Sequence, residues 1–494
     1  MLTIRRSCCW TAVIALLAGA AGACAVSTDL SRASAVRVAA TPSSASAAEC
    51  VLLSPTYGSS PSGPTTVVTA REAYECLLRH YGGIAVLRPE LLLRAAMAGV
   101  VGYMKRHGED SRAAALPALS SDPGAAWRSF ERAFTQAIDG IPAGSRQLSG
   151  LVSAAILSMA ASLHDDHTQY TPAGQVPLGA QQPDLGMYVR TLGPALRTPR
   201  AMLVDDLDPA GPAAAAGLRP GDLVERVDGH SVPVPPASDL GSPAVDEAAR
   251  LWTPAQLGWI PAHTHWVNLL VRRPANGRQF SLKVAVARSM FNISSRTLPG
   301  HVAYVRIHGF FTPSTGREAI EALRRRHPRN GVIIDLRGNT GGNPQALAGL
   351  IGGFVHHKLL AVNIDRTGRR HALQSDDSVA LLQQPLVMLI DGGSLSAAEI
   401  AAADVRDLRL GSLVGERTAG VVAGAGLPFA LDDGSVLAID TAAAYGPNRE
   451  IIDDIGVPAD QAAPLPTPRQ LGHGQDPGIT TALRKLTFEH TRRR

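Results

Sequence analysis

The stretch from Pro385 to Gly420 constrains the fold of this 494-residue chain more than any other. The apolar run Leu386 to Ile390 is typical of a buried strand, and Asp391-Gly392-Gly393 marks a sharp turn after it. A helix-forming segment then begins at Ser394 or Ser396. A serine at a helix N-terminus lies among unpaired backbone N–H groups, where developing negative charge is favoured. It is a candidate nucleophile, although one of the two serines could simply cap the helix.

The composition indicates a globular protein of about two to four domains. Hydrophobic residues make up 45% of the chain and charged residues 18%. The net charge of +5 comes mostly from dispersed arginines, because lysine occurs only at positions 105, 283, 358 and 485. No basic run is interleaved with aromatic residues, which argues against nucleic-acid binding.

The first residues predict export. Arg5 and Arg6 precede an apolar run from Trp10 to Ala21, which is the pattern of a signal peptide over residues 1–24. The small residues before Cys24 resemble a bacterial lipoprotein signal, with Cys24 as the lipidated residue. We therefore expect a protein of the cell envelope, held on the outer face of the membrane by a signal or lipid anchor, or secreted.

After export two cysteines remain, Cys50 and Cys76. In an oxidising compartment they suggest a disulfide, and two free thiols are the alternative. Residues 25–64 are rich in Ser, Ala, Pro and Thr and are interpreted as a flexible tether. Residues 65–174 have helical periodicity and end in a polar segment that contains His167. A lone histidine in such a loop is usually an ordinary surface residue.

Residues 180–288 predict a small β-rich domain, because short strand-like runs alternate with glycine and proline turns. The segment 211–229, GPAAAAGLRPGDLVERVDG, resembles a PDZ domain of the bacterial processing-protease type. Such domains hold a C-terminal carboxylate on backbone N–H groups. The corresponding peptide-binding loop here would be Leu185, Gly186, Met187 and Tyr188. Residues 232–259 are an insertion of unassigned role, and a domain that only spaces its neighbours is the alternative.

From residue 289 to 466, strands alternate with amphipathic helices, which predicts an α/β layered domain. Residues 467–494 are left as a C-terminal tail. Gly338, Gly341 and Gly342 follow a buried strand and allow close approach of a ligand to the backbone. The spacing matches neither nucleotide-binding glycine motif, so we expect no cofactor. The fold class is multidomain α+β, with a helical N-terminal region, a PDZ-like domain and an α/β core.

Taken together, these motifs resemble the C-terminal processing (tail-specific) serine peptidases. The resemblance covers about Thr69 to Pro466 and rests on YVRIHGF, IDLRGNTGG, GERTAG, DDIGVPAD and the serine stretch, in this order. It implies a ClpP/crotonase-like peptidase core. In the family pattern Ser-x-Ser-x-Ser-Glu the middle serine is the nucleophile, which corresponds to Ser396.

One departure from the family pattern concerns the base. The position of the family's catalytic lysine corresponds to Val421, and no lysine occurs between Lys358 and Lys485. Arg417 remains protonated and cannot serve as a base. The lysine-free relatives, such as the tricorn core and nisin-resistance-type peptidases, use a histidine from the segment ahead of the serine domain, which corresponds to His167.

The same resemblance implies the remaining site residues. The acidic residue that orients the histidine corresponds to Asp453, with Asp454 beside it. Oxyanion donors would be the N–H of Ala397 and that of Gly341 or Gly342. The expected function is an exported serine endopeptidase that cleaves proteins or peptides selected by their C-terminal tails. The alternative is an inactive exported scaffold or peptide-binding protein that keeps the fold.

Overall fold

The computed structural model describes residues 50–53, 63–109, 114–165, 167–173, 184–190, 201–232, 251, 253–254, 259–260, 264–287, 291–424 and 426–492. The expected signal peptide, Cys24 and most of the 232–259 insertion lie outside these residues. In the part of the chain that is described, no helix has the length and apolar character needed to span a membrane.

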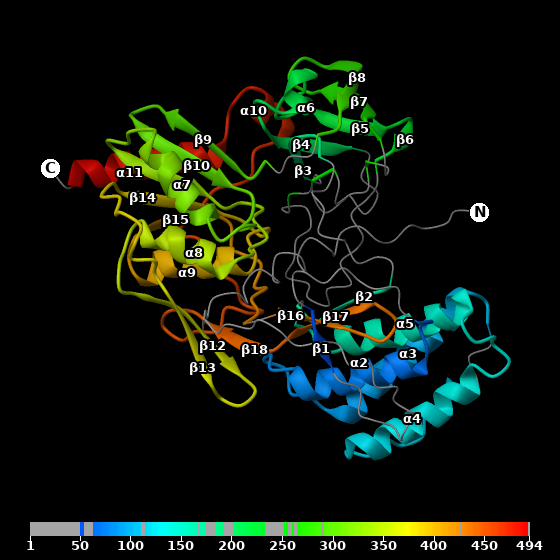
Figure 1. The fold of residues 1–494 in the computed structure, drawn as a ribbon. Coiled ribbons are helices and arrows are strands. Elements are labelled where there is room, and N and C mark those ends of the chain that lie inside the picture. The colour runs from blue at the N-terminus through cyan, green and yellow to red at the C-terminus, as the bar shows by residue number, and fades with distance from the viewer. Residues whose placement is uncertain are drawn as a thin grey trace, which may run out of the picture.

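Four helices make up the N-terminal region (Figure 1). They are α2 (Val67–His80), α3 (Pro89–Arg106), α4 (Pro123–Ala137) and α5 (Arg146–Ala161). Side-chain oxygens of Thr66, Asp122 and Ser145 cap three of them, which satisfies N–H groups that lack a partner inside the helix. Their apolar faces enclose a core in which Tyr74 and Trp127 stack with ring centroids 5.5 Å apart.

A four-stranded antiparallel sheet closes this region and is assembled from three distant parts of the chain. Its order is β1-β16-β17-β2, with β1 (Val51–Leu52), β16 (Gly426–Ala430), β17 (Val436–Asp440) and β2 (Gln169–Thr171). A disulfide between Cys50 and Cys76, with Cα atoms 5.7 Å apart, ties the start of β1 to α2. His167 lies two residues before β2, so this sheet fixes where the end of the histidine loop lies.

The small domain is an antiparallel sheet in the order β3-β4-β5-β7-β8, with β6 paired to β5. The elements are β3 (Met187–Arg190), β4 (Met202–Leu207), α6 (Pro212–Ala215), β5 (Leu223–Val227), β6 (His230–Ser231), β7 (Trp266–Arg273) and β8 (Arg278–Ala285). Side chains alternate along β3 because successive residues of a strand point to opposite faces. Met187 and Val189 pack into the domain's own core, whereas Tyr188 contacts residues of the neighbouring α/β core.

The core contains a six-stranded sheet in the order β19-β15-β14-β11-β10-β9. The strands are β9 (Ile293–Leu298), β10 (Val302–Ile307), β11 (Gly331–Asp335), β14 (Leu386–Ile390), β15 (Gly411–Gly415) and β19 (Gln461–Ala462). All neighbours are parallel except β9, which is antiparallel to β10. Mixed α/β layers therefore form the core, as the alternating pattern predicts.

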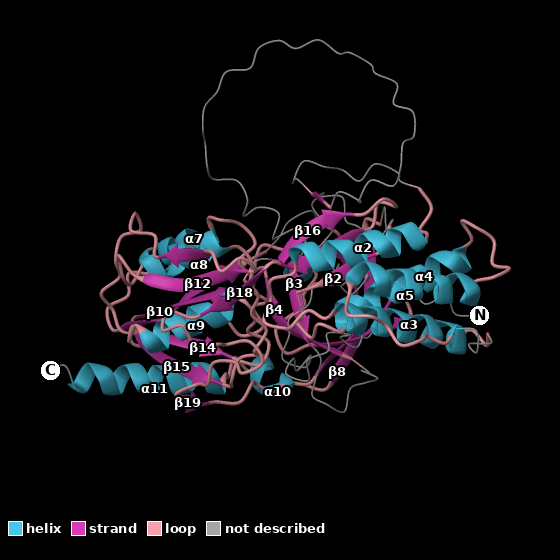
Figure 2. Cartoon of the chain, turned by 90° about the horizontal axis from the view of Figure 1, so that it is seen from below, coloured by secondary structure: helices cyan, strands magenta, loops and turns pink. Residues whose placement is uncertain are grey.

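Helices cover both faces of this sheet (Figure 2). On one face lie α7 (Thr315–Arg324), α8 (Pro344–Gly352) and α9 (Ala397–Asp407). On the other face lies α11 (Pro477–Arg492), which buries Ile479, Ala482 and Leu486. A second sheet, β13-β12-β18, joins β12 (Leu359–Asp365), β13 (Arg370–Gln374) and β18 (Ala442–Tyr445).

The C-terminal residues link the small domain to the core. The short helix α10 (Pro468–Gly472) lies beside the small domain, where Leu471 packs on Leu203 and Leu223. The segment expected as a tail from residue 467 thus contributes α10 and α11 to the packed structure.

Candidate active site

Two turns meet at the carboxyl ends of the adjacent parallel strands β11 and β14. One is the glycine-rich turn Gly338–Gly342, and the other is the serine turn Asp391–Ser396. Hydrogen bonds join them: the Leu395 N–H donates to the Asn339 carbonyl at 2.9 Å, and the Gly338 N–H donates to Asp391 Oδ1 at 2.8 Å. The register of the two strands therefore sets the position of one turn relative to the other.

The two candidate serines have different surroundings. Ser394 is fully buried, and its hydroxyl donates to the Leu336 carbonyl at 2.8 Å, so it braces the turn. Ser396 is half-buried and directly precedes α9. Its backbone has φ 54° and ψ −120°, a strained conformation for a residue with a side chain. Of the two serines, only Ser396 combines partial exposure with a place at the helix N-terminus.

Two backbone N–H groups of the turns are candidate oxyanion donors. Within the described residues, no hydrogen bond uses the N–H of Ala397 or of Gly342. The Gly341 N–H, in contrast, donates to Asn339 Oδ1 at 2.8 Å. Of the two glycines named as alternatives, Gly342 thus has the available donor in this structure, while Gly341 packs against Ser396.

Glu399 joins the serine turn to the loop 418–421. Its fully buried carboxylate accepts hydrogen bonds from the Thr418 hydroxyl at 2.6 Å and from two N–H groups of the loop, Gly420 and Val421, each at 2.7 Å. The Ser396 N–H donates to the same side chain at 3.2 Å. Burial raises the pKa of Glu399 to about 7, and these hydrogen bonds oppose the shift.

The sequence interpretation gave Glu399 no role of its own beyond the family pattern. Glu399 stands three residues after Ser396, which is the spacing of a helix capping box. This spacing indicates that the Glu399 side chain can bond to the Ser396 backbone. The loop that it holds comes from a distant part of the sequence, which no local pattern predicts.

Val421 stands at the position where the family resemblance predicts a lysine, and its surroundings are apolar. Val421 packs with Leu395 and Ala419 in a small buried cluster. Its carbonyl accepts a hydrogen bond from the Ser396 N–H at 2.8 Å. The structure therefore places a hydrophobic side chain where a lysine base would be expected.

Asp453 and Asp454, the two candidates for the orienting carboxylate, lie beside the loop that contains Gly420 and Val421. Asp453 is half-buried and its Oδ1 accepts a hydrogen bond from the Val422 N–H at 2.9 Å. Asp454 is exposed, and its N–H donates to the Gly420 carbonyl at 2.7 Å. Of the two, Asp453 directs its carboxylate to the loop that contacts Ser396.

His167 is buried in the loop between α5 and β2. Asp165 organises this loop, because its carboxylate accepts hydrogen bonds from the Thr168 N–H at 2.6 Å and from the Thr168 hydroxyl at 2.8 Å. Burial lowers the pKa of His167, and the Asp165 carboxylate opposes this shift. Among the described residues, no hydrogen bond joins the imidazole to Ser396.

The candidate peptide-binding residues lie at the start of β3. Leu185, Met187 and Tyr188 have buried side chains, and Gly186 has φ +70°. Tyr188 stacks on the His308 ring of the core with centroids 3.8 Å apart, and its hydroxyl donates to the Phe291 carbonyl at 2.8 Å. Of these residues Tyr188 contacts the core, whereas Leu185 and Met187 pack inside the small domain.

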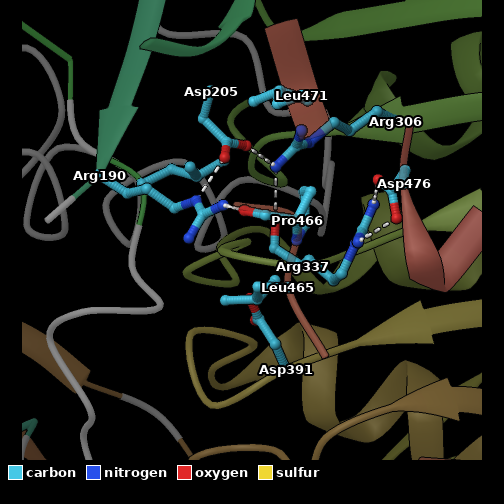
Figure 3. Close-up of a pocket in the computed structure, with 10 residues that line it drawn as sticks. Arg190, Asp205, Arg306, Arg337, Asp391, Leu465, Pro466, Leu471 and Asp476 are labelled. Atoms are coloured by element: carbon cyan, nitrogen blue, oxygen red, sulfur yellow. Dashed lines mark hydrogen bonds and ion pairs between the residues drawn. The ribbon is translucent and has the colours of Figure 1, made fainter. Parts of the chain in front are cut away.

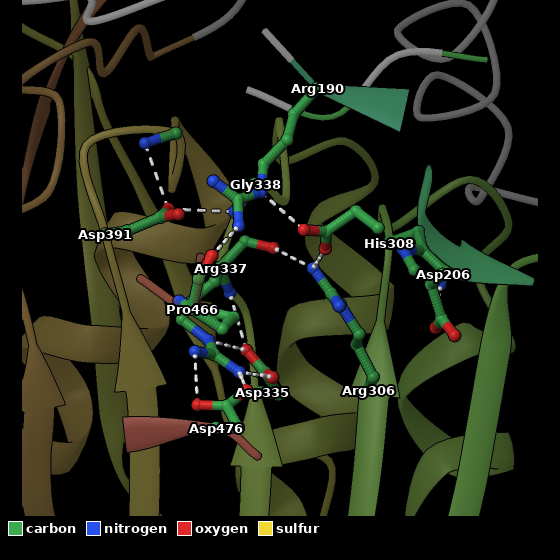
Figure 4. A network of polar contacts seen from close by, with 12 residues as sticks. Arg190, Asp206, Arg306, His308, Asp335, Arg337, Gly338, Asp391, Pro466 and Asp476 are labelled. Carbon is green, nitrogen blue, oxygen red and sulfur yellow. Dashed lines mark hydrogen bonds and ion pairs between the residues drawn. The ribbon is translucent and has the colours of Figure 1, made fainter. Parts of the chain in front are cut away.

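A buried network of charges continues this contact (Figure 4). Asp205 of β4 pairs with Arg190 of β3 and, at 2.7 Å, with Arg306 of β10. Burial alone would raise the pKa of Asp205, but the two guanidinium groups hold it well below its usual range. The carboxylate is therefore ionised and connects the small domain to the core.

Arg337, in the glycine-rich turn region, forms two further pairs. It donates bidentately to Asp335, at 2.9 and 2.6 Å, and to Asp476, at 3.1 and 2.8 Å. Arg190 also donates to the Pro466 carbonyl at 2.8 Å. Between these groups lies a small cavity with room for about one water molecule (Figure 3). The small domain, the core and the C-terminal segment meet here, beside the turn that carries Gly338.

No group of three or more His, Cys, Asp or Glu side chains among the described residues could hold a metal ion. Around the two turns the structure therefore has a serine at a helix N-terminus, two N–H groups without a hydrogen bond among the described residues, and the carboxylates of Glu399 and Asp453. His167 lies in a separate loop, before β2. These groups are of the kind that acyl transfer requires.

Parts of the chain are similar in sequence to known peptidases. Residues 301–463 match the model of peptidase family S41. Carboxyl-terminal-processing peptidase 2, chloroplastic, from Arabidopsis thaliana is 28% identical over 376 residues, which cover 70% of this chain and 68% of the relative. A carboxyl-terminal-processing protease from Synechocystis is 27% identical over 264 residues, covering 52% of this chain and 57% of the relative.

A solved structure of a photosystem II D1 C-terminal processing protease covers 78% of this chain and 98% of its own, with 24% identity and a TM-score of 0.42. The match to family S41 thus covers residues 301–463, and both relatives named above are C-terminal processing peptidases.

Proposed function

We propose that the chain is an exported serine endopeptidase that acts on protein or peptide substrates, with Ser396 as its nucleophile. The observation that carries the proposal is the environment of Ser396, a strained, half-buried residue at the N-terminus of α9 that packs against Gly341. Among the described residues, the N–H groups of Ala397 and Gly342 form no hydrogen bond. A hydroxyl in this position attacks a carbonyl while the N–H groups stabilise the oxyanion.

In the proposed mechanism, His167 takes the proton of the Ser396 hydroxyl as the oxygen attacks the peptide carbonyl carbon. The tetrahedral intermediate collapses when the imidazolium protonates the leaving amine, and water then hydrolyses the acyl-enzyme with His167 again as base. Burial keeps the imidazole neutral at pH 7, as a base requires. Asp453 is the proposed orienting carboxylate. The mechanism requires a hydrogen bond between the His167 imidazole and the Ser396 hydroxyl, which is not formed among the described residues of this structure.

We further propose that the small domain selects substrates by their C-terminal tails. Support comes from the PDZ-like segment 211–229 and from β3, which stands at the end of the sheet order where an extended peptide could add. Export, with attachment to the membrane through a signal or a lipid on Cys24, rests on the N-terminal sequence pattern.

The second candidate is an inactive exported scaffold that keeps the fold. It is favoured by the apolar cluster at Val421, where a lysine base would otherwise lie, and by the missing hydrogen bond between His167 and Ser396. The two candidates predict opposite results with a reagent that reacts only with an activated serine.

Labelling with a fluorophosphonate is that test. We expect covalent labelling of the intact protein and none of Ser396→Ala or His167→Ala. The exposed residues Ser378 and His265 provide matched controls, because Ser378→Ala and His265→Ala should label as the intact protein does. Absence of labelling in the intact protein would favour the scaffold, and labelling that persists in His167→Ala would refute His167 as the base.

A further inference from the structure

The loop proposed to receive a substrate carboxylate already binds one. The Leu185 N–H donates to Asp184 Oδ1 at 2.7 Å, and the Gly186 N–H also donates to the Asp184 carboxylate. Two consecutive N–H groups that point to one oxygen-bearing group form an anion-binding nest. The positive φ of Gly186, +70°, is a conformation that favours glycine at this turn.

Asp184 is held firmly in this position. Its backbone N–H and carbonyl both hydrogen-bond to Ala287, at 2.7 and 2.8 Å, and only 5% of the residue is exposed. No lysine or arginine of the described residues forms an ion pair with it. A buried carboxylate without a cation is costly unless hydrogen bonds compensate it, and here the loop N–H groups provide them.

The charge of Asp184 is affected by its neighbours. Burial raises the pKa of this carboxyl to about 6, the two N–H groups lower it, and the Asp208 carboxylate raises it. The Asp184 charge in turn raises the pKa of Tyr188, which is buried nearby. The carboxyl is therefore largely ionised at neutral pH, so its charge resembles that of a peptide C-terminus.

We propose that Asp184 is an internal ligand of the carboxylate-binding loop, and that the C-terminal carboxylate of a substrate peptide binds there only by displacing it. The inference rests on the proposed tail-reading function of the small domain. A tail that pairs with β3 would require the same two N–H groups for its carboxylate. Asp184 and the tail therefore compete for one site.

Competition lowers the apparent affinity for the tail, because only the fraction of molecules with an open loop can bind it. Removal of the Asp184 carboxylate should therefore strengthen tail binding. We expect a gain of about tenfold for Asp184→Ala, which corresponds to an open loop in roughly one molecule in ten. Asp184→Asn should show a smaller gain, because its neutral oxygen is a weaker acceptor than a carboxylate.

The test uses the full chain with Ser396→Ala, so that no peptide is cleaved. The probe is a fluorescein-labelled decapeptide mixture with randomised last four positions, made once with a free C-terminal carboxylate and once as the amide. Fluorescence anisotropy measures both affinities for the parent and for Asp184→Ala, Asp184→Asn and Asp208→Asn. The last variant removes a nearby charge that does not occupy the loop N–H groups. Thermal unfolding verifies that each variant is folded.

The inference is supported if Asp184→Ala binds the free acid most tightly, Asp184→Asn less tightly and the parent least tightly. The affinity for the amide should stay the same in all proteins, and Asp208→Asn should bind much as the parent does. If the parent prefers the free acid and both Asp184 variants show the same affinities, the competition by Asp184 is refuted. The tail-reading function would remain supported in that case. Equal binding of acid and amide by all proteins would refute tail reading itself, and the inference with it.

Discussion

Gly341 and Ser396 are in direct contact across the two turns of the candidate active site. A Cβ placed on Gly341 would lie 2.7 Å from the Ser396 Cβ and 2.9 Å from the Ala397 nitrogen. No side chain fits there without displacing the serine turn, and the φ of Gly341, +83°, also disfavours one. The contact couples the glycine-rich turn to the proposed nucleophile.

Gly341→Ala should therefore abolish most of the serine reactivity while the protein remains folded. We expect the rate of fluorophosphonate labelling to fall by about 100-fold or more, because one misplaced oxyanion donor has an effect of that size. Gly368→Ala is the matched control, since Gly368 has φ +81° and no atom within 4 Å of an added Cβ. Equal labelling rates in the two variants would show that the contact is unimportant.

Arg306→Met should weaken the attachment of the small domain. Asp205 would keep Arg190 as a partner but lose its ion pair to the core. Loss of one partner from a buried pair typically costs 3–5 kcal/mol, and because one partner remains we expect about 3 kcal/mol in the free energy of unfolding. A double-mutant cycle with Asp205→Asn in urea measures the coupling. Strict additivity would indicate that the two side chains do not interact.

Glu399→Gln should make stability less dependent on pH. The folded-state pKa of Glu399, about 7, lies above the ordinary glutamate value of 4.5, so the folded protein binds an extra proton between these values. The wild type therefore loses stability relative to the variant as the pH rises from 4.5 to 7, by on the order of 3 kcal/mol. Urea unfolding of both proteins at pH 5 and pH 8 measures this difference. A difference that is constant or grows in the opposite direction would contradict the raised pKa.

The pH dependence of labelling tests His167. Its neutral form is the proposed base, and burial lowers the pKa of the ring, so reactivity should be lost only as the pH falls below 6.5. The Asp165 carboxylate raises this pKa, so Asp165→Asn should move the loss to still lower pH. An acid limit above pH 6.5 in the wild type, or a limit that rises in Asp165→Asn, would exclude this role.

The local elements of the core followed from the sequence. The run Leu386–Ile390 predicts a strand and coincides with β14, and the helix after the serines is α9. These elements can be predicted because the pattern of apolar residues and the turn residues depend on only a few neighbouring positions. The glycine-rich turn was placed correctly after its strand, but which glycine N–H remains unpaired depended on the Asn339 side chain.

Local sequence patterns did not predict the contacts between segments that are distant in the chain. The sheet beside His167 joins residues 51–52, 169–171 and 426–440, and Glu399 is bound to a loop about 20 residues away. Such pairings depend on how whole elements pack, and single-sequence patterns contain no information on that.

The sequence by itself determined the chemistry that is present: two serines after a buried strand, a glycine-rich turn, a histidine in a polar loop and no lysine near the serine. Only the tertiary structure decided which of these groups are exposed and free of hydrogen bonds, and so able to take part in that chemistry. It buried Ser394 in a structural hydrogen bond, left Ser396 half-buried, and occupied the N–H groups of Leu185 and Gly186 with Asp184. The physical reason is that burial and hydrogen-bond partners, which decide whether a polar group can react or bind, are fixed only when the elements pack together.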